Sequence, residues 1–421
     1  MITRLLFILT VMILSFRSTP VLSAESSFQD FALRDGDTVM FLGDSITAAG
    51  IYGKVIENYT LLRYPHRKVR FLNAGWGGDT AAGGLKRLTR DVLNRGATVV
   101  TVAYGVNDIG WGTKADAEHR QIYLDGIRGI VEECRKRGVR VYICSAAITG
   151  ADPARSENDF LQRMCDDGMA LSKSLGGNAI DVQRYMRGIQ RKVWQANEGT
   201  TDAKAKATLH TEDGIHLNEM GQYAMALAIL KGLGAPSDVS SATLDFTNSE
   251  KPNSQGCRVS SVRATTDSLE FDRLDDGLPL NLGLGWLISY RFLPVADELN
   301  RYMLTIRNLP SGRYDVIADG RLVGTYGHEA LGAGQNLGSA TPDPWIPGGP
   351  WDSQASVVRA LTDSRFELAS ALRNGNTYLG NEKSRKQLAL DWERLNTEME
   401  SAQRRAARPT SYHFVIRPAA K

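Results

Sequence analysis

Short apolar runs alternate with longer helical stretches over the first half of the chain. Residues 120–136 show the clearest helical spacing, and residues 219–233 give a last helix. The apolar runs, rich in β-branched residues, lie at 39–42, 69–72, 99–103, 139–143 and 179–182. Near-continuous apolar strands separated by helices indicate a parallel sheet that is covered on both faces. Residues 28–234 are therefore predicted to form an α/β sandwich, with its chemistry beyond the carboxyl ends of the strands.

The pattern changes after this unit, and residues 235–238 are typical of a linker. Residues 301–306 and 314–317 alternate apolar and polar positions and are separated by a turn, which favours an antiparallel β unit. The C-terminal region, 239–421, is predicted to contain a β-rich part at 239–340, a helical part at 351–407 and a closing strand at 411–416.

The first residues are typical of a targeting segment. Arg4 precedes an uninterrupted apolar stretch at 5–16, and small residues at Ser23 and Ala24 offer a cleavage site. Because the apolar stretch is shorter than the roughly 20 residues of a membrane span, we favour a cleaved signal peptide at 1–24 over an uncleaved anchor. The mature protein is then expected to be secreted or periplasmic, without a membrane span.

Charge and cysteine content exclude some classes of function. The formal net charge is +3, from 50 Lys and Arg against 47 Asp and Glu scattered together, which argues against a nucleic-acid partner. The four cysteines form no dense disulfide framework. Cys144 falls in a predicted core strand, whereas Cys134, Cys165 and Cys257 could pair or stay free. The oligomeric state is left open.

The first candidate for chemistry stands at the end of the first predicted strand. Ser45 lies in the sequence Gly-Asp-Ser-Ile-Thr, with a helix expected after it. A serine at such a turn has its hydroxyl near backbone N–H groups and the positive end of a helix dipole, which stabilise developing negative charge. Serine is also a common helix cap. The assignment therefore depends on the residues at the ends of the later strands.

Two further strand ends offer hydrogen-bond donors. The second strand ends in a glycine-rich turn that contains Gly78, and the third is followed by Asn107. Each turn alone could simply connect two secondary-structure elements, without a functional role. An oxyanion hole for acyl transfer could be formed by three donors: the N–H of Ser45, the N–H of Gly78 and the side chain of Asn107.

A nucleophilic serine also needs a base, and the candidate is His216. Asp213 lies three residues before it on a tight turn, where a carboxylate can bind Nδ1–H and stabilise the imidazolium, leaving Nε2 free to take the serine proton. The other histidines show no equivalent arrangement and are expected to be solvated surface residues: His66, His119, His210, His328 and His413.

These segments, in this order, resemble the conserved blocks of the SGNH hydrolases, also called the GDSL family. Ser45 matches the block I nucleophile, Gly78 and Asn107 the oxyanion residues, and Asp213 with His216 the acid and base. The match covers residues 38–234. The resemblance implies a flavodoxin-like three-layer sandwich and ester hydrolysis that needs no metal or other cofactor. Thr47 replaces the leucine of the family's nickname, as is common in its carbohydrate-esterase branches.

Two other interpretations compete with this one. Asp44, Asp79 and Asp108 all lie at strand ends and could be metal ligands, but such a site would leave the serine and histidine without a role. We expect these carboxylates to orient loops by hydrogen bonds. A non-catalytic glycan-binding protein on this fold would ordinarily have lost a reacting residue, and none is missing here.

The substrate is suggested by two tryptophans. Trp76 and Trp111 lie after the second and third strands, where their faces could stack on sugar rings or pack under neighbouring loops. No apolar lid segment is visible. With the export signal and the family resemblance, this favours a short-chain O-acyl (acetyl) esterase acting on carbohydrates. Lysophospholipase or thioesterase activity is the alternative.

Overall fold

The computed structural model describes residues 31–155, 157–202, 205–248, 252–266, 268–283, 291–338 and 348–420. The predicted signal peptide at 1–24 lies outside these residues. Residues 31–421 form one compact unit. Within the described ranges, no helix combines the length and the apolar character that crossing a membrane would require.

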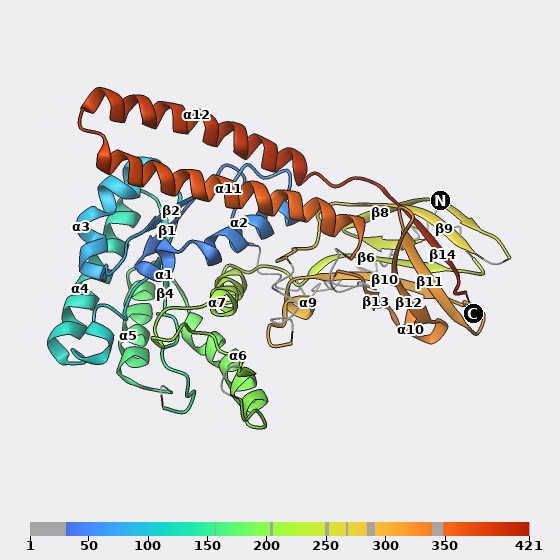
Figure 1. The fold of residues 1–421 in the computed structure, drawn as a ribbon, viewed down its shortest axis with the longest axis horizontal. Helices are drawn as coiled ribbons and strands as arrows, with labels where there is room; N and C mark the ends of the chain where they lie inside the picture. The colour runs from blue at the N-terminus through green and yellow to red at the C-terminus, as the bar shows by residue number, and fades with distance from the viewer. Residues whose placement is uncertain are drawn as a thin grey trace, which may run out of the picture. The chain divides into compact units, whose positions relative to one another are not determined.

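A parallel five-stranded sheet with the order β2-β1-β3-β4-β5 carries the N-terminal part (Figure 1). Its strands are β1 (Thr38–Gly43), β2 (Arg70–Gly75), β3 (Val99–Ala103), β4 (Arg140–Cys144) and β5 (Asn178–Ile180). The predicted α/β sandwich is confirmed. β5 ends before Val182 because the side chain of Asp181 accepts a hydrogen bond from the N–H of Arg184 at 3.1 Å and so caps the next helix.

Helices cover both faces of this sheet. Val39 and Phe41 of β1 point into one apolar core, whereas Met40 and Leu42 point into the other. The first core is closed by α2 (Ile51–Arg63), α6 (Val182–Asn197) and α7 (Glu219–Gly232). The second is closed by α3 (Ala81–Asp91), α4 (Ala117–Lys136) and α5 (Phe160–Ser174). The expected three-layer arrangement is present.

Two further sheets form the C-terminal β region. One has the order β13-β10-β6-β7 and consists of β6 (Asp238–Asp245), β7 (Asn253–Gln255), β10 (Arg301–Arg307) and β13 (Gln335–Asn336). The other has the order β12-β11-β14-β9-β8 and consists of β8 (Cys257–Ala264), β9 (Leu269–Asp275), β11 (Arg313–Ala318), β12 (Arg321–Gly327) and β14 (Tyr412–Pro418).

The expectation that residues 301–306 and 314–317 belong to one antiparallel unit is wrong. β10 pairs parallel with β6, whereas β11 lies between β12 and β14 in the other sheet. The chain changes sheets at 308–312, where Asn308 has a φ of 58°. By contrast, Asp319 and Gly320 form the turn that joins β11 to β12, and both residues have positive φ, as a tight hairpin requires.

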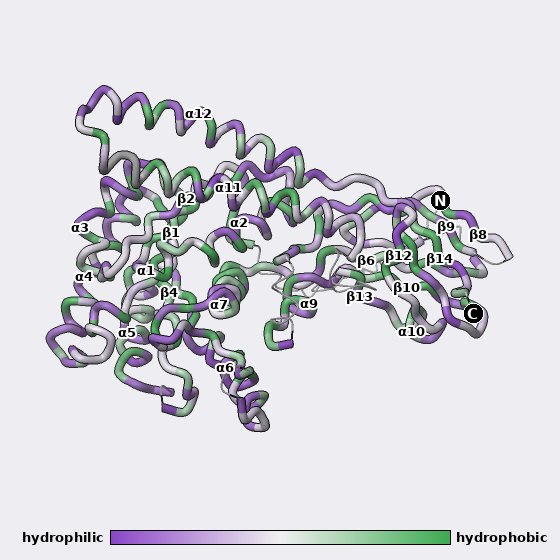
Figure 2. Tube along the Cα trace, viewed as in Figure 1, coloured by the Kyte–Doolittle hydropathy of each residue, from purple (hydrophilic) through white to green (hydrophobic). Residues whose placement is uncertain are grey.

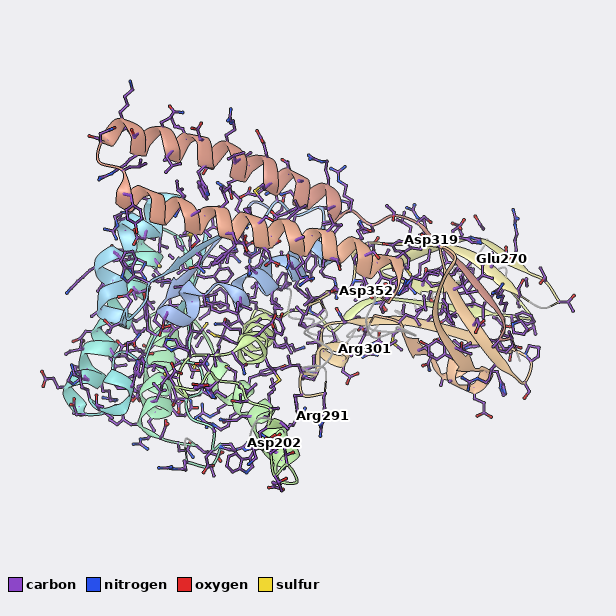
Figure 3. All side chains as sticks on the ribbon, in the orientation of Figure 1. Asp202, Glu270, Arg291, Arg301, Asp319 and Asp352 are labelled. Carbon is purple, nitrogen blue, oxygen red and sulfur yellow. The ribbon has the colours of Figure 1, made fainter. Side chains whose placement is uncertain are left out.

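A helical hairpin separates the β region from its last strand. It consists of α11 (Pro350–Tyr378) and α12 (Glu382–Ala406), which run side by side, and α11 lies along α2 (Figure 1). Asp352, at the start of α11 (Figure 3), accepts hydrogen bonds from the N–H groups of Gly348 and Gly349 at 3.1 and 3.3 Å. α12 is largely hydrophilic (Figure 2), but its Trp392 is buried in the second core of the α/β unit.

The hairpin covers β2, which is an edge strand of the parallel sheet. Arg365 of α11 donates to the carbonyl of Phe71 at 3.3 Å, and Arg70 of β2 pairs with Glu393 and Glu400 of α12 at 3.0 and 3.3 Å. β14 then returns between β9 and β11, so the end of the chain is held within a sheet. Covering an edge in this way prevents it from pairing with another chain.

Candidate active site

Ser45 begins the short helix α1 (Ser45–Ala48), directly beyond the carboxyl end of β1. Asp44 caps this helix, since its carboxylate accepts a hydrogen bond from the N–H of Ile46 at 2.9 Å. Gly43 is required at the turn because a Cβ there would lie 2.1 Å from Oγ1 of Thr47 and 2.8 Å from the carbonyl of Ala103. The N–H of Ser45 has no hydrogen-bond partner among the described residues. Both the hydroxyl and the N–H of Ser45 can therefore take part in chemistry.

His216 lies within hydrogen-bond distance of this serine. Its Nε2 is 2.9 Å from Oγ of Ser45, and its Nδ1 is 2.5 Å from Oδ2 of Asp213. Because a carboxylate only accepts hydrogen bonds, Nδ1 carries the proton and Nε2 is left as the acceptor for the serine hydroxyl. The structure thus brings together the three residues that the sequence nominated as nucleophile, base and acid.

Asp213 is held as an anion by its own turn. The imidazole of His216 and then the N–H groups of Ile215 and His216 lower the pKa of this carboxyl far below its usual range. Oδ1 accepts those two N–H groups at 2.8 and 2.9 Å and the hydroxyl of Thr211 at 2.9 Å. A carboxylate fixed in this way keeps the imidazole ring in one orientation and one tautomer.

Asn107 is oriented by two neighbours. Its Nδ2 donates to the carbonyl of Asp79 at 3.0 Å, and its Oδ1 accepts from Nε1 of Trp111 at 2.8 Å. A carbonyl can only accept and an indole can only donate, so these contacts fix which end of the amide is which. The second N–H of Nδ2 is left for another acceptor. Gly78 is exposed, has a φ of 72°, and its N–H has no partner in the described part of the chain.

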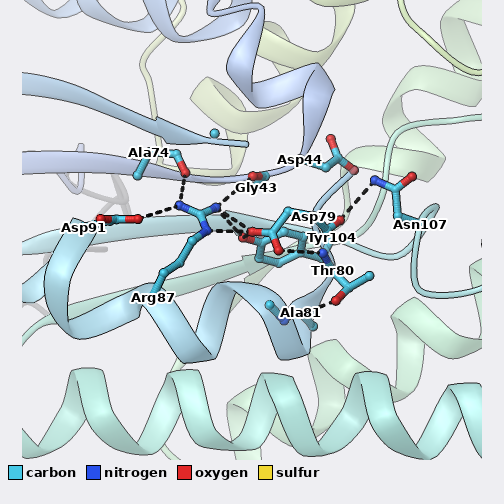
Figure 4. Close-up of polar contacts among 12 residues, drawn as sticks. Gly43, Asp44, Ala74, Asp79, Thr80, Ala81, Arg87, Asp91, Tyr104 and Asn107 are labelled. Carbon is cyan, nitrogen blue, oxygen red and sulfur yellow. Dashed lines mark hydrogen bonds and ion pairs between the residues drawn. The ribbon is translucent and has the colours of Figure 1, made fainter. Parts of the chain in front are cut away.

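A guanidinium that the sequence reasoning missed lies beneath this turn (Figure 4). Arg87 of α3 donates from Nε to Oδ2 of Asp79 at 2.7 Å, and from Nη1 to the carbonyl of Ala74 at 2.7 Å. Its Nη2 donates to the carbonyl of Gly43 at 3.2 Å and to the hydroxyl of Tyr104 at 2.9 Å. Tyr104 in turn donates to Oδ2 of Asp79 at 2.9 Å. One arginine, whose side chain is 10% exposed, thus joins the ends of β1 and β2 to the loop that holds Asn107.

The two tryptophans named from the sequence are both exposed. Trp76 has 63% and Trp111 has 52% of its surface accessible. The ring of Trp111 meets that of His216 edge-on, with centroids 5.7 Å apart. Beside it opens a cavity of 280 Å³, lined mainly by apolar side chains that include Ile109, Phe160 and Ile215.

The carboxylates considered as metal ligands make hydrogen bonds to the chain. Oδ1 of Asp108 accepts from the N–H of Ala81 at 2.9 Å, and Oδ1 of Asp79 accepts from that of Thr80 at 3.0 Å. Burial raises the pKa of Asp44 to about 6 and that of Asp108 to about 7. Over the described ranges, no group of three or more His, Cys, Asp or Glu side chains could hold a metal ion.

Two histidines differ from the prediction. Nδ1 of His119 lies 2.9 Å from Oδ1 of Asp116, three residues before it, so an aspartate–histidine pair with the spacing of Asp213 and His216 occurs a second time, at the start of α4. His210 is only 4% exposed, and its Nε2 donates to the carbonyl of Ile148 at 2.9 Å, so it is not a solvated surface residue. It is buried because it pairs with Leu217 beside the turn that carries Asp213 and His216. All four cysteines are free thiols: Cys134, Cys144, Cys165 and Cys257.

The segment that carries this geometry is similar to a known protein family. Residues 41–224 match the model of the GDSL-like lipase/acylhydrolase family. This part of the chain belongs to that family. The protein is accordingly a carboxylic ester hydrolase, and the predicted resemblance to GDSL hydrolases is confirmed. No protein of curated function matches the sequence.

Solved structures extend the comparison beyond the family segment. A gut microbial diltiazem-metabolizing enzyme aligns over 92% of this chain and 98% of its own, with a TM-score of 0.76 and 21% identity. At this identity the likeness shows a shared fold, and this shared fold includes the C-terminal region of the chain.

Two esterases align with the N-terminal part only. An acetyl xylan esterase covers 46% of this chain and 98% of its own at 21% identity and a TM-score of 0.40. A catalytic mutant of an acetylxylan esterase from Geobacillus stearothermophilus covers 48% and 96% at 19% identity and a TM-score of 0.39. No conclusion about this chain rests on these two likenesses.

Proposed function

We propose that this hydrolase is a serine esterase in which Ser45, His216 and Asp213 form the catalytic triad. The observation that carries the proposal is the continuous hydrogen-bonded chain from Oγ of Ser45 through both ring nitrogens of His216 to Asp213, at 2.9 and 2.5 Å. Such a chain lets the imidazole accept the serine proton while the carboxylate stabilises the resulting imidazolium.

The reaction then proceeds in two acyl-transfer steps. Nε2 of His216 takes the hydroxyl proton as Oγ of Ser45 attacks the ester carbonyl, and the carbonyl oxygen becomes an oxyanion. The N–H groups of Ser45 and Gly78 and the side chain of Asn107 would donate to this oxyanion. The proton on Nε2 passes to the leaving alcohol, which departs and leaves an acyl-serine. Water, deprotonated by the same nitrogen, releases the acid and restores the serine.

We further propose that the natural substrates are short-chain O-acyl esters, chiefly acetates, of carbohydrates. Exposed tryptophan side chains are uncommon because indole is largely apolar, yet Trp76 and Trp111 are both more than half exposed beside the donors. Their faces suit stacking on the apolar faces of sugar rings. An exported enzyme, released by cleavage after residue 24, would meet such polymers outside the cytoplasm.

One observation favours the lipolytic alternative. The 280 Å³ cavity beside Trp111 includes the apolar side chains of Ile109, Phe160 and Ile215 in its lining, and it could take an acyl chain longer than acetyl. A lysophospholipase or thioesterase would use such a cavity.

The deciding experiment compares the two substrate classes. Acetate release from acetylated xylan, acetylated glucomannan and acetylated pectin is measured beside fatty-acid release from lysophosphatidylcholine and from a long-chain acyl thioester. We expect acetate from at least one polysaccharide and little fatty acid, with Ser45→Ala as the blank. Faster release of fatty acid than of acetate would establish the lipolytic alternative.

A further inference from the structure

A second cavity lies at helix α6, away from the residues described so far. It has a volume of 640 Å³ and is enclosed by one face of α6 and by residues 206–210. This volume falls within the roughly 300–1,000 Å³ of small-molecule sites. The loop after α6 passes Asp202, which lies beside the end of the helix (Figure 3). We call this cavity the α6 pocket; its polar and aromatic lining includes Gln190, Trp194, Asn197, Glu198, Lys206 and His210.

The helical wall presents an aromatic side chain flanked by polar ones. Gln190, Trp194 and Asn197 are spaced four and three residues apart, which places them in a row on one face of the helix. Trp194 is 42% exposed although its indole is large and mostly apolar. An aromatic face in a row with amides offers stacking and hydrogen bonding to the same ligand.

Gln190 supplies a buried acceptor. Its Nε2 donates to the carbonyl groups of Gly150 and Ala151 at 2.7 and 3.3 Å, which fixes the orientation of the amide. Gln190 is only 3% exposed, and its Oε1 is buried without a hydrogen-bond partner among the described residues. A buried acceptor without a donor costs about 1–3 kcal/mol, so a hydroxyl group supplied by a ligand would be stabilising.

His210 belongs to the opposite wall of the pocket. Its Nε2 must carry a proton because it donates to the carbonyl of Ile148, which leaves Nδ1 as an acceptor in the neutral ring. Burial lowers the pKa of His210, and this favours the neutral form. Acceptors on both walls, the ammonium of Lys206 and the carboxylate of Glu198 match a ligand with many hydroxyl groups.

The α6 pocket lies behind the turn that carries the acid and base. His210 pairs with Leu217, and the N–H of Thr211 donates to the carbonyl of His216 at 2.8 Å. His210 lines the α6 pocket, whereas neither His216 nor Ser45 is among its lining residues. A ligand in this pocket is therefore held close to the reacting centre but outside it.

We propose that the α6 pocket binds a sugar unit of the polysaccharide whose ester group is cleaved at Ser45. This inference rests on the proposed function. The same polymer chain then contacts the enzyme both at Ser45 and at the α6 pocket. Because the second contact forms within an existing complex, the affinity for the polymer increases.

The test uses the full-length protein and the substitution Trp194→Ala. We expect the KM for the acetylated polysaccharide to rise roughly three- to tenfold, from the loss of one stacking contact. The ratio of kcat/KM on this polymer to kcat/KM on p-nitrophenyl acetate should fall by the same factor. Trp194→Phe should recover part of the loss. Gln195→Ala, an exposed neighbour that does not line the pocket, is the matched control and should change neither value.

Direct binding separates this inference from the proposed function. Ser45→Ala protein should bind deacetylated oligosaccharides of the polymer that the wild type deacetylates, and the added Trp194→Ala change should weaken that binding. Acetate release by the wild type with an unchanged KM in Trp194→Ala would overturn the pocket assignment alone. Failure of the wild type to release acetate from any polysaccharide would overturn the proposed function, and this inference with it.

Discussion

At the scale of single residues, the candidate site is positioned by side chains that have no proposed role in the reaction itself. Arg87 holds the ends of two strands and the carboxylate of Asp79, and the carbonyl of Asp79 orients the amide of Asn107. The position of Asn107, a proposed oxyanion donor, therefore depends on this guanidinium. A planar fork with several fixed donors is needed there, which lysine cannot supply.

Arg87→Lys should lower kcat for p-nitrophenyl acetate by roughly 10- to 100-fold with a smaller change in KM, because displaced donors act mainly on transition-state charge. Arg90→Lys is the matched control, since Arg90 is exposed and pairs with Asp91, as Arg87 also does. Thermal unfolding of both variants is measured alongside. A fall in kcat that merely tracks a loss of folded protein would contradict a positioning role.

Asp108 gives a prediction about pH and stability. Burial raises its pKa to about 7 in the folded protein, whereas the unfolded carboxyl ionises near pH 4, so the folded state binds the proton more tightly. The group therefore costs stability progressively as the pH rises from about 4 to about 7, and the cost is complete above that.

Asp108→Asn should therefore raise the free energy of unfolding at pH 8 by on the order of 4 kcal/mol, and by far less at pH 4.5. The amide oxygen can still accept the hydrogen bond from the N–H of Ala81. Urea unfolding at the two pH values measures the difference. An equal effect at both would show that ionisation of Asp108 is not the cause.

The sequence was sufficient to nominate the candidate site because each nominated residue lies within a short motif, either just after a strand end or in the turn before the last helix of the α/β unit. Ser45, Asn107 and His216 are of this kind. Arg87 could not be found, because its partners come from two strands and a loop whose meeting depends on the complete fold. His210 was misassigned for the same reason, since a lone histidine carries no local sign of burial.

At the scale of elements, the helical hairpin is held to α2 by a buried polar network. The guanidinium of Arg365 forms a very short ion pair with the carboxylate of Glu57, and Gln403 donates to the same carboxylate at 2.8 Å. The hydroxyl of Thr362 donates to Asn58 at 2.6 Å. Gly50, five residues after Ser45, leaves no room for a Cβ because the ring of Phe366 would lie 2.1 Å from it.

Arg365→Leu should destabilise the protein by about 3–5 kcal/mol, because it leaves the carboxylate of Glu57 buried without its cation. The double variant Glu57→Leu/Arg365→Leu should recover much of this loss. Arg394→Leu, at an exposed position of α12, is the control and should have little effect. A double variant that is less stable than Arg365→Leu would contradict this explanation, because the loss would then not come from the unpaired charge of Glu57.

Local sequence patterns predicted the parallel sheet but not the two C-terminal sheets. The five strands of the first sheet are apolar over nearly their whole length and alternate with helices, which is a local signal. β14 pairs with β9, and the hairpin α11–α12 lies between them in the chain. Such long-range pairing has no signature in a short window of sequence.

At the scale of the whole molecule, one apolar core extends from the α/β unit into the C-terminal β region. Tyr59 of α2 and Leu278, Tyr302 and Phe414 of the later part belong to the same buried cluster. Arg63 of α2 also donates to the carbonyl of Leu299 at 2.6 Å. The C-terminal region is therefore bound to the α/β unit through its core.

A protein that ends after Pro236 should be poorly soluble, because the face of α2 that packs against the hairpin and the β region would meet water. Soluble yield, size-exclusion profile and unfolding temperature are the measurements. A stable, monodisperse fragment with full activity on small esters and on the polysaccharide would show that the C-terminal region is a separable appendage.

The central claim is that Ser45 is the nucleophile of an ester hydrolase, and Ser45→Ala tests it most directly. Turnover of p-nitrophenyl acetate by purified wild type and variant is compared under identical conditions, with circular dichroism to confirm an unchanged fold. The account predicts a loss of roughly 10⁴-fold or more in kcat, as is typical when a triad nucleophile is removed. A folded variant that retains more than about a tenth of the wild-type rate would contradict it.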